Sequence, residues 1–409
     1  MTEFLSRGAL RERLAAASFD RPPALVANAH VTGLGVARAL DAHDVPVIAV
    51  DRTDTGVAPP STAVDVAGAV SYPLEDPEGF RADVEALADA AGSELVAFGC
   101  MDEWVHGLAD TDPEGVRLAS AGKDAIDAVL DKSALYRLAE DLGIPYPETR
   151  WLADTDPADA AEQLGLPLVV KPAFKRAFEE AVGTNVVEVA TVEQLRDVVA
   201  TAREADIEVL AQEAVPVAPG RDASLASYVP PAGVDEALSV VGNARRRHPR
   251  GFGTSCVVET ADRPVVEERA LAVLDETGYH GISEAEFVYD SDREAYVLLD
   301  VNTRPWKWIG LPVAAGANLP LAAYADAVGR QYDSDGVGEA RWVSLSDYLR
   351  GLAGDAPDLL DPSAWHALLS GGFESRPDLT TAVYRPSDPG PARQLLYNEV
   401  GGGEYYCAC

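Results

Sequence analysis

The apolar and polar positions near the start of the chain predict a strand, a helix and a second strand. Residues Ala24 to Ala27 form an apolar run, Val36 to Ala42 have helical spacing, and Val45 to Val50 are rich in β-branched residues. Gly33 and Gly35 stand between the first run and the helix. We therefore expect a βαβ unit with a glycine turn after its first strand.

A further strand is expected at Leu95 to Phe98, after a polar helix from Asp76 to Ala91. It leads directly into Met101, Asp102 and Glu103, which then lie at the carboxyl end of a strand. Ligands of open α/β sheets bind at this edge. The N-terminal region is therefore predicted as a Rossmann-like α/β domain with polar groups at its ligand-binding edge.

The rest of the chain predicts an α+β arrangement. A helical stretch from Lys123 to Leu142 ends at a glycine and proline cluster, which marks a unit boundary. Beyond it, Leu168 to Lys171 and Asn185 to Val189 predict a hairpin with a loop over residues 173–184. No motif is evident after about Gly336. The other expected elements are helices at Thr191 to Ala205, Val265 to Thr277 and Leu319 to Val328, and strands at Glu208 to Gln212, Ala223 to Tyr228, Leu238 to Arg245, Ile282 to Tyr289 and Ala295 to Val301.

Composition limits the classes of function. The chain has 409 residues, enough for several domains, and 47% of them are hydrophobic, enough to form cores. The net charge of −34 opposes binding to nucleic acid and to anionic lipid. No uncharged apolar stretch approaches the roughly 20 residues that cross a bilayer, and residues 1–19 lack an apolar signal core. We expect a cytoplasmic protein without nucleic acid or membrane partners, from a salt-adapted (halophilic) cell because concentrated salt screens this self-repulsion.

Two features are weak candidates for a site. The segment from Thr32 to Arg38 could place backbone donors beside an anion, and Asp51 could accept from a ribose hydroxyl in a nicotinamide-dependent oxidoreductase. A dinucleotide fingerprint wants a small residue where Arg38 stands, so a structural turn is the simpler interpretation. Cys407 and Cys409 could bind a metal, although a frayed tail is simpler, and the four cysteines have no disulfide or zinc spacing.

A stronger candidate is a set of oxygen donors on two adjacent predicted strands. Asp300 and Asn302 are two residues apart and face one side of a strand, and Glu286 can lie opposite them across a hairpin. Such a trio suits Mg²⁺, which takes its other ligands from water and phosphate. The alternative is solvated strand acids. It is weakened because the apolar run around Asp300 makes a free acid costly.

Basic residues form the third group of candidates. Only five of the 33 basic residues are lysines, and two of these, Lys132 after the N-cap candidate Asp131 and Lys171 at a strand end, could neutralise phosphate. Ordinary surface lysine is the alternative. The cluster Arg245, Arg246 and Arg247 could bind an anionic substrate, or it could pair with surface acids. Trp306, Lys307 and Trp308 could line a substrate pocket, with core packing as the alternative for the tryptophans.

Together these segments resemble the ATP-grasp superfamily and, within it, the predicted carboxylate-amine ligases. The resemblance covers about Ala24 to Val328 and implies an N-terminal α/β domain (1–122), a small ATP-grasp lobe with a lid (123–212), a large lobe with the metal site (213–334) and a C-terminal extension (335–409). The motifs that carry it are Leu130 to Ser133, Leu142 to Pro145, Leu168 to Pro172, Gln212-Glu213, Glu286-Phe287 and Asp300 to Arg304.

The resemblance implies a role for each candidate residue. Lys132 and Lys171 would contact the phosphates of ATP, Gln212, Glu213 and Val215 would edge the adenine, and Arg304 would bind the reacting carboxylate or acyl phosphate. Glu286, Asp300 and Asn302 would hold Mg²⁺ or Mn²⁺. Two departures stand out: the loop 173–184 has only Gly183 where many relatives have several glycines, and Asp300 stands where glutamate is usual.

The implied activity is ATP-dependent joining of a small carboxylate to an amine through an acyl phosphate, in a chain that could form a homodimer. An ATP-grasp carboxylase or phosphotransferase and a nucleotide-binding protein without turnover are the alternatives. No Ser-His-Asp or Cys-His arrangement is evident, in agreement with chemistry that depends on positioning and electrostatics.

Overall fold

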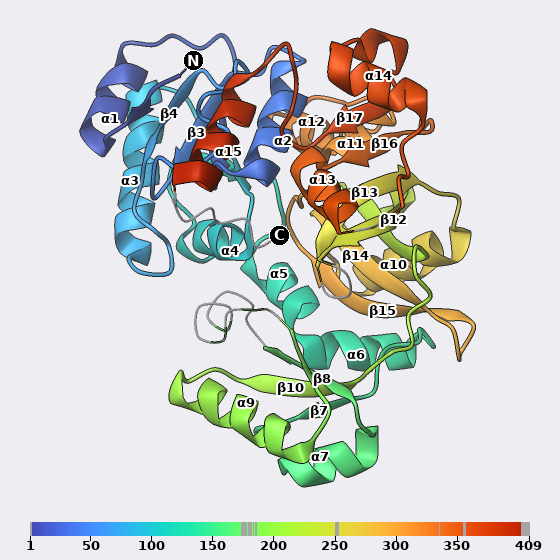
Figure 1. Ribbon diagram of the computed structural model, residues 1–409. Coiled ribbons are helices and arrows are strands. Elements are labelled where there is room, and N and C mark those ends of the chain that lie inside the picture. The colour runs from blue at the N-terminus through green and yellow to red at the C-terminus, as the bar shows by residue number, and fades with distance from the viewer. Residues whose placement is uncertain are drawn as a thin grey trace. The chain divides into compact units, whose positions relative to one another are not determined.

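The computed structural model describes residues 2–172, 178, 182, 184, 186–249, 253–334, 336–354 and 357–401 (Figure 1). Most of the predicted lid, the segment 250–252 and both terminal cysteines lie outside these described residues. The chain divides into two compact units. The first unit comprises Met1–Val129, Ala223–Ala285 and Val301–Cys409, and the second comprises Leu130–Asp222 and Glu286–Asp300.

The first unit contains a six-stranded parallel sheet. Its strands, in spatial order, are β1 (Phe4–Leu5), β4 (Val66–Ala69), β3 (Val47–Asp51), β2 (Ala24–Ala27), β5 (Leu95–Gly99) and β6 (Val116–Leu118). The predicted βαβ unit and the strand before Met101 are therefore confirmed. Because the chain builds outward from β2 on one side and from β5 on the other, the order reverses between these two strands, and such a switch point is where ligands of α/β sheets bind.

The helices of this sheet are α1 (Arg7–Ala15), α2 (Val31–Asp41), α3 (Pro77–Ala91) and α4 (Asp102–Thr111). The predicted glycine turn is wrong, because Gly33 and Gly35 lie inside α2. A Cβ on Gly33 would lie 2.2 Å from the carbonyl oxygen of Asn28, and one on Gly35 would lie 2.6 Å from Cγ2 of Ile309. Close packing of the helix, rather than a turn, therefore requires these glycines.

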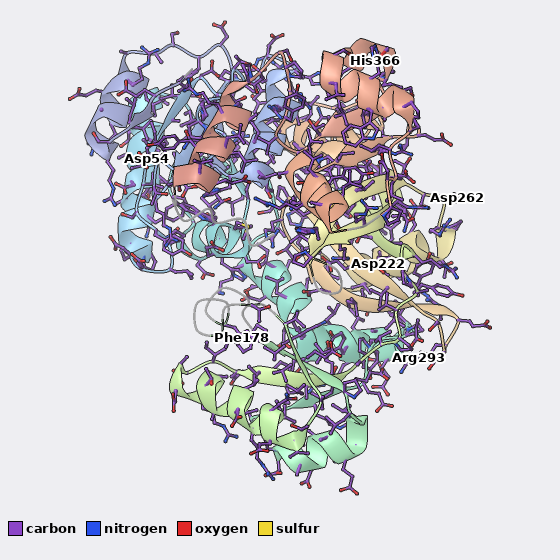
Figure 2. The ribbon with its side chains drawn as sticks, viewed as in Figure 1. Asp54, Phe178, Asp222, Asp262, Arg293 and His366 are labelled. Atoms are coloured by element: carbon purple, nitrogen blue, oxygen red, sulfur yellow. The ribbon has the colours of Figure 1, made fainter. Side chains whose placement is uncertain are left out.

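The second unit is built on a four-stranded antiparallel sheet with the spatial order β7 (Thr149–Trp151), β10 (Val209–Glu213), β8 (Leu168–Pro172) and β9 (Val187–Val189). The predicted hairpin of β8 and β9 is confirmed. Helices α7 (Pro157–Leu164) and α9 (Val192–Glu204) cover one face of this sheet (Figure 1). Phe178, labelled in Figure 2, is fully buried in the core that they enclose.

A seven-stranded sheet consists, in spatial order, of β15 (Ala295–Asn302), β14 (Gly281–Asp290), β11 (Asp222–Val229), β12 (Leu238–His248), β13 (Thr254–Thr260), β16 (Arg341–Val343) and β17 (Leu379–Thr381). The division between the two units falls within β14 and β15. The predicted helices are present as α10 (Pro264–Glu276) and α12 (Leu319–Ala327), and the short helix α11 (Gly310–Ala314) precedes α12.

The C-terminal extension, in which the sequence predicted no element, supplies β16 and β17 and the helices α13 (Leu345–Ala353), α14 (Pro362–Ser370) and α15 (Gly390–Gly401). It is anchored on the N-terminal sheet through Asp388. The carboxylate of Asp388 accepts from Nη2 of Arg38 at 2.8 Å and from Oγ of Ser61 at 2.7 Å. Arg38, which occupies the small-residue position of a dinucleotide fingerprint, is therefore half of a buried ion pair.

In the part of the chain that the structure describes, no helix is long and apolar enough to cross a membrane.

Candidate active site

Lys132 is positioned by a break in the helical stretch that the sequence predicted as continuous. The stretch forms two helices, α5 (Lys123–Leu130) and α6 (Lys132–Asp141), because Asp131 caps the second one as predicted. Oδ1 of Asp131 accepts from the backbone N–H groups of Ser133 and Ala134 at 2.8 and 3.0 Å. The break places Lys132 at the first position of α6.

The ammonium of Lys132 contacts Asp300. Its Nζ donates to Oδ1 of Asp300 at 2.9 Å, and the two side chains are 8% and 14% exposed. The two residues are 168 positions apart in sequence and both belong to the second unit. The structure therefore brings together a predicted phosphate ligand and a predicted metal ligand.

The other predicted metal ligands are Glu286 of β14 and Asn302, which follows Asp300 on β15. Glu286 is a half-buried residue of β14 in the second unit. Asn302 belongs to the first unit, where its buried Nδ2 donates to Oε2 of Glu284 at 3.2 Å. This bond orients the amide, so its carbonyl oxygen is the atom that can bind a cation. Glu284 was not predicted, although its position two residues before Glu286 on a strand was a usable signal.

The expected donor set consists of two carboxylates and an amide. Among the described residues, no group of three or more His, Cys, Asp or Glu side chains is arranged to hold a metal ion. Two carboxylates and an amide nevertheless fit Mg²⁺, which keeps several waters and takes phosphate oxygens. Asp300 already binds one cationic group, the ammonium of Lys132, in a nearly buried position, so its carboxylate is suited to a divalent cation.

Gln212 holds a buried tyrosine in place. The amide is 1% exposed, and its Nε2 donates to Oη of Tyr136 at 2.8 Å and to Oγ1 of Thr149 at 2.9 Å. Tyr136 in turn donates to the carbonyl of Leu299 at 2.9 Å, and its ring stacks on Tyr146 with centroids 5.2 Å apart. Burial, together with the charge of Asp300, raises the pKa of Tyr136, so the phenol stays neutral. Sequence reasoning missed Tyr136, one helical turn after Lys132.

Glu213 forms a polar cluster at the end of β10. Its Oε1 accepts from Nη2 of Arg293 at 2.6 Å and from the backbone N–H of Glu148 at 2.8 Å. Arg293, labelled in Figure 2, also pairs with Asp290 at 2.5 Å. Val215 follows β10 and is half-buried. The side chain of Glu213 thus fixes local structure, and an adenine role for this segment remains a prediction.

Lys171 lies near the end of β8, opposite Leu210 of β10 in the sheet register, and is half-buried. It belongs to the same unit as Lys132, Gln212, Glu286 and Asp300. With Glu213 and Val215, seven of the eight predicted nucleotide and metal residues, all except Asn302, are therefore carried by one compact unit.

Arg304 pairs with a residue that was predicted separately. Its guanidinium is 5% exposed, and Nε donates to Oδ1 of Asp102 at 2.6 Å, with both residues in the first unit. Asp102 begins α4, just after β5, as expected for the carboxyl edge of the sheet. The arginine predicted to bind a reacting carboxylate is thus oriented by a carboxylate at the switch point.

The arginine cluster makes mainly structural contacts. Arg245 lies 3.8 Å from Glu259, and the guanidinium of Arg246 lies 4.8 Å from the ring centre of Tyr348 and donates to the carbonyl of Pro357. Arg247 donates to the carbonyl of Gly253 at 3.4 Å. The ion-pairing alternative fits Arg245, while substrate binding by the cluster remains a prediction.

Two further sequence candidates have structural roles. Trp306 and Trp308 are 3% and 4% exposed and pack edge to face, which supports the core-packing alternative. Asp51 is 2% exposed and accepts from the backbone N–H groups of Ala29 and Arg52 at 2.8 and 2.7 Å. The proposed ribose acceptor therefore fixes the loop after β2.

The parallel N-terminal sheet, the small antiparallel sheet and the large sheet that carries Glu286 and Asp300 define the ATP-grasp fold with a Rossmann-like domain before it. No protein-family model matches the chain. Solved structures with this fold include the ADP complex of PurK, an N5-carboxyaminoimidazole ribonucleotide synthetase, with a TM-score of 0.63, 14% identity and coverage of 83% of this chain and 85% of that one.

Two other proteins are similar to the chain, one in structure and one in sequence. Biotin carboxylase from Campylobacter jejuni has a TM-score of 0.61 at 14% identity and covers 78% of this chain and 75% of its own. The C-terminal section of the carbamoyl phosphate synthase large chain of Methanopyrus kandleri is 23% identical over 227 residues, which are 51% of this chain and 38% of that protein. The chain thus spans well under half the length of this curated relative.

Proposed function

We propose that the protein is an ATP- and Mg²⁺-dependent ligase that activates a small carboxylate and joins it to an amine. The observation that carries the proposal is the contact between Lys132 and Asp300 at 2.9 Å. It brings an ammonium group and a carboxylate together from distant segments, on a fold shared with structures solved with ATP analogues and ADP. A magnesium–triphosphate complex needs carboxylates that bind the metal ion and, beside them, ammonium groups that bind the phosphates.

In the proposed reaction, a carboxylate oxygen of the substrate attacks the γ-phosphorus of ATP, and the bond to the β,γ-bridging oxygen breaks. ADP leaves and an acyl phosphate forms. The amine then attacks the acyl carbon, phosphate departs with its oxygen, and the amine proton passes to solvent. Each step moves negative charge onto oxygen, so the protein accelerates it mainly by positioning cationic groups.

Each residue has a defined task in this proposal. Lys132 and Lys171 neutralise phosphate oxygens as compact point charges. Arg304, oriented by Asp102, binds the carboxylate that becomes the acyl phosphate. Glu286, Asp300 and Asn302 would hold the magnesium ion, which supplies further neutralisation of phosphate charge when bound. One turn of α6 separates Lys132 from Tyr136, and Tyr136 accepts a hydrogen bond from the buried Gln212.

A carboxylase is the second candidate, because biotin carboxylase and carboxyaminoimidazole ribonucleotide synthases recur among the similar structures. In that case the activated acid would be bicarbonate, converted to carboxyphosphate. The same residues would act in the same way, and only the activated acid and its acceptor would differ.

The test is a screen of carboxylate and amine pairs for ADP release in concentrated KCl with Mg²⁺, with the product mass measured. A ligase requires both substrates and forms an amide whose mass is the sum of acid and amine less water. A carboxylase releases ADP with bicarbonate and one acceptor. ADP release that is indifferent to every acid, or ATP binding without any turnover, would contradict the proposal. The Lys171→Ala variant should bind ATP more weakly than the Lys123→Ala control, whose lysine is an exposed residue of α5 paired with Asp110 and Asp127.

A further inference from the structure

Helix α6 is tied to strand β15 at two neighbouring residues of the strand. Nζ of Lys132, at the first position of the helix, donates to Oδ1 of Asp300 at 2.9 Å. Oη of Tyr136, one turn later, donates to the carbonyl of Leu299 at 2.9 Å. All four residues belong to the second unit. The two donors come from positions about 6 Å apart along the helix axis, so together the contacts fix the direction of the helix relative to the strand as well as its distance.

The hydroxyl of Tyr136 is engaged on both sides. A carbonyl can only accept, so the phenol hydrogen points to Leu299 and the oxygen is left to accept from another donor. That donor is Nε2 of Gln212 at 2.8 Å, and the same nitrogen donates to Oγ1 of Thr149 at 2.9 Å. Gln212 and Tyr136 are 1% and 5% exposed, so solvent has little access to these bonds. The orientation of the hydroxyl is therefore set from β10.

The segment of β15 that ends at Asp300 is bound at three consecutive residues. The N–H of Leu298 donates to the carbonyl of Pro145, in the loop after α6, at 2.8 Å, and the next two residues are those that accept from α6. The ring of Tyr136 stacks on Tyr146 with an angle of 11° between the planes. Because stacking holds the ring, the hydroxyl can be removed while the ring stays in place.

Asp300 needs a fixed position because its carboxylate serves two cations in the proposed site. Its Oδ1 already accepts from Lys132, and the same carboxylate must bind the metal ion. Mg²⁺ requires oxygen ligands at about 2.0–2.1 Å in nearly ideal octahedral geometry. Loss of a group that orients a metal ligand typically weakens metal binding about 10- to 100-fold. A small shift of the backbone next to Asp300 would therefore weaken the binding of the metal more than the binding of the nucleotide alone.

We propose that Tyr136, oriented by Gln212, is a positioning residue that fixes Asp300 for the magnesium ion. The inference rests on the proposed function, because that function gives Asp300 its metal ion. Gln212 then acts through Tyr136 on the metal side of the nucleotide, a task that needs no contact with adenine.

The test measures how much Mg²⁺ tightens the binding of a non-hydrolysable ATP analogue. Calorimetric titration in concentrated KCl gives the Kd of the analogue once with excess Mg²⁺ and once with EDTA, and the ratio of the two values measures the coupling between metal and nucleotide. We expect Mg²⁺ to tighten binding at least tenfold in the wild type. In Tyr136→Phe this ratio should fall at least fivefold, while the Kd in EDTA stays within twofold of the wild type. A purely structural role would lower stability and leave the ratio unchanged.

The control for the loss of a hydroxyl is Tyr146→Phe, which changes the ring stacked on Tyr136. Oη of Tyr146 donates to Oε2 of Glu140 at 3.5 Å and does not engage Leu299. This variant should keep the wild-type ratio.

Tyr136→Phe leaves the buried amide of Gln212 without one of its acceptors, so a folding defect would mimic lost metal binding. The double variant Tyr136→Phe/Gln212→Met removes the donor together with that acceptor, and paired replacement by apolar groups of similar shape is nearly neutral for stability. Thr149, the other acceptor, keeps its bond to the carbonyl of Pro147. The double variant should melt close to the wild type and show the same reduced ratio.

The positioning role is overturned if the wild type shows the Mg²⁺ effect and Tyr136→Phe or the double variant reduces it less than fivefold, or if Tyr146→Phe reduces it as much. An equal fall of affinity in EDTA would also overturn it, because that pattern marks damage to the whole nucleotide site. The proposed function fails in a different way: the wild type would bind no nucleotide, or would bind it equally well with and without Mg²⁺, and the inference would fail with it.

Discussion

Replacing Lys132 by methionine tests the central contact of the proposed ATP site. Methionine keeps much of the length and apolar stem of lysine and removes only the charge and its donors. At the observed 2.9 Å, and with an effective dielectric constant of about 20, the attraction between the two charges is about 6 kcal/mol before desolvation. Desolvation offsets part of this, and removing one partner of a buried pair costs about 3–5 kcal/mol. Since both side chains retain some exposure, we expect a loss of about 3 kcal/mol of stability.

The Lys132→Met variant should also bind ATP more weakly, and this loss of affinity is distinct from its loss of stability. A hydrogen bond to a charged group contributes about 1.5–3 kcal/mol, so losing one ammonium–phosphate contact should raise the Kd for ATP about 10- to 100-fold. Calorimetric titration with ATP and Mg²⁺, at a temperature where the variant is fully folded by circular dichroism, measures this change. Denaturant unfolding measures the stability loss independently.

The matched control is Lys123→Met. The side chain of Lys123 is 50% exposed, and its ammonium pairs with Asp110 and Asp127. Exposed pairs contribute roughly 0–1 kcal/mol, so this variant should keep ATP affinity and most of its stability. If Lys132→Met binds ATP within twofold of the wild type while folded, Lys132 does not contact the phosphates, and the site must be placed elsewhere.

Three further outcomes are expected. Asp300→Asn should abolish Mg²⁺-dependent turnover and leave the fold intact, because the asparagine oxygen still accepts from Lys132; retained activity with Mg²⁺ would remove Asp300 from the metal site. Asp388→Ala should cost about 3–5 kcal/mol of unfolding free energy, because it leaves the buried guanidinium of Arg38 without its carboxylate partner. Burial by itself raises the pKa of Asp388, but hydrogen bonds from Ser61 and Arg38 lower it overall, so this stabilisation is present above the unfolded pKa of about 3.9 and should vanish in denaturant titrations as the pH falls through the lower folded value. Finally, the net charge of −34 predicts that unfolding free energy rises with KCl up to roughly 1 M, and full stability near 0.1 M would refute salt adaptation.

The elements that the sequence predicted best are strands that are buried on both faces. The runs Ala24 to Ala27 and Leu95 to Phe98 are strands in the structure because they are buried on both faces, and an apolar run between turn residues is the signal of such strands. The cap at Asp131 was also readable, since an N-cap depends only on local geometry. Local chemistry therefore located Lys132 at a helix start.

What the sequence did not reveal depends on distant neighbours. Gly33 looked like part of a turn, and its real constraint is the carbonyl of Asn28 under the helix. The strands β16 and β17 have only three residues each, too few for a periodic pattern. β16 forms by pairing with the edge of β13, and β17 forms by pairing with β16. Likewise, no local pattern could show that Arg304 faces Asp102, 202 positions away.

Three of the lysines that the structure describes show why the rare residue type was an informative signal. Lys123 is half exposed and pairs with surface acids, as any basic residue could. Lys132 and Lys307 are only 8% and 10% exposed, and each contacts a carboxylate from a distant segment, Asp300 or Asp347. A planar guanidinium is larger and needs a flat partner, whereas an ammonium occupies little space and donates in three directions. Enclosure alone does not select lysine, because Arg38 and Arg304 are enclosed as well and pair with carboxylates. At Lys132 and Lys307 the side chain supplies a compact charge whose three donors can reach partners in different directions, which is the property that binding phosphate oxygens requires.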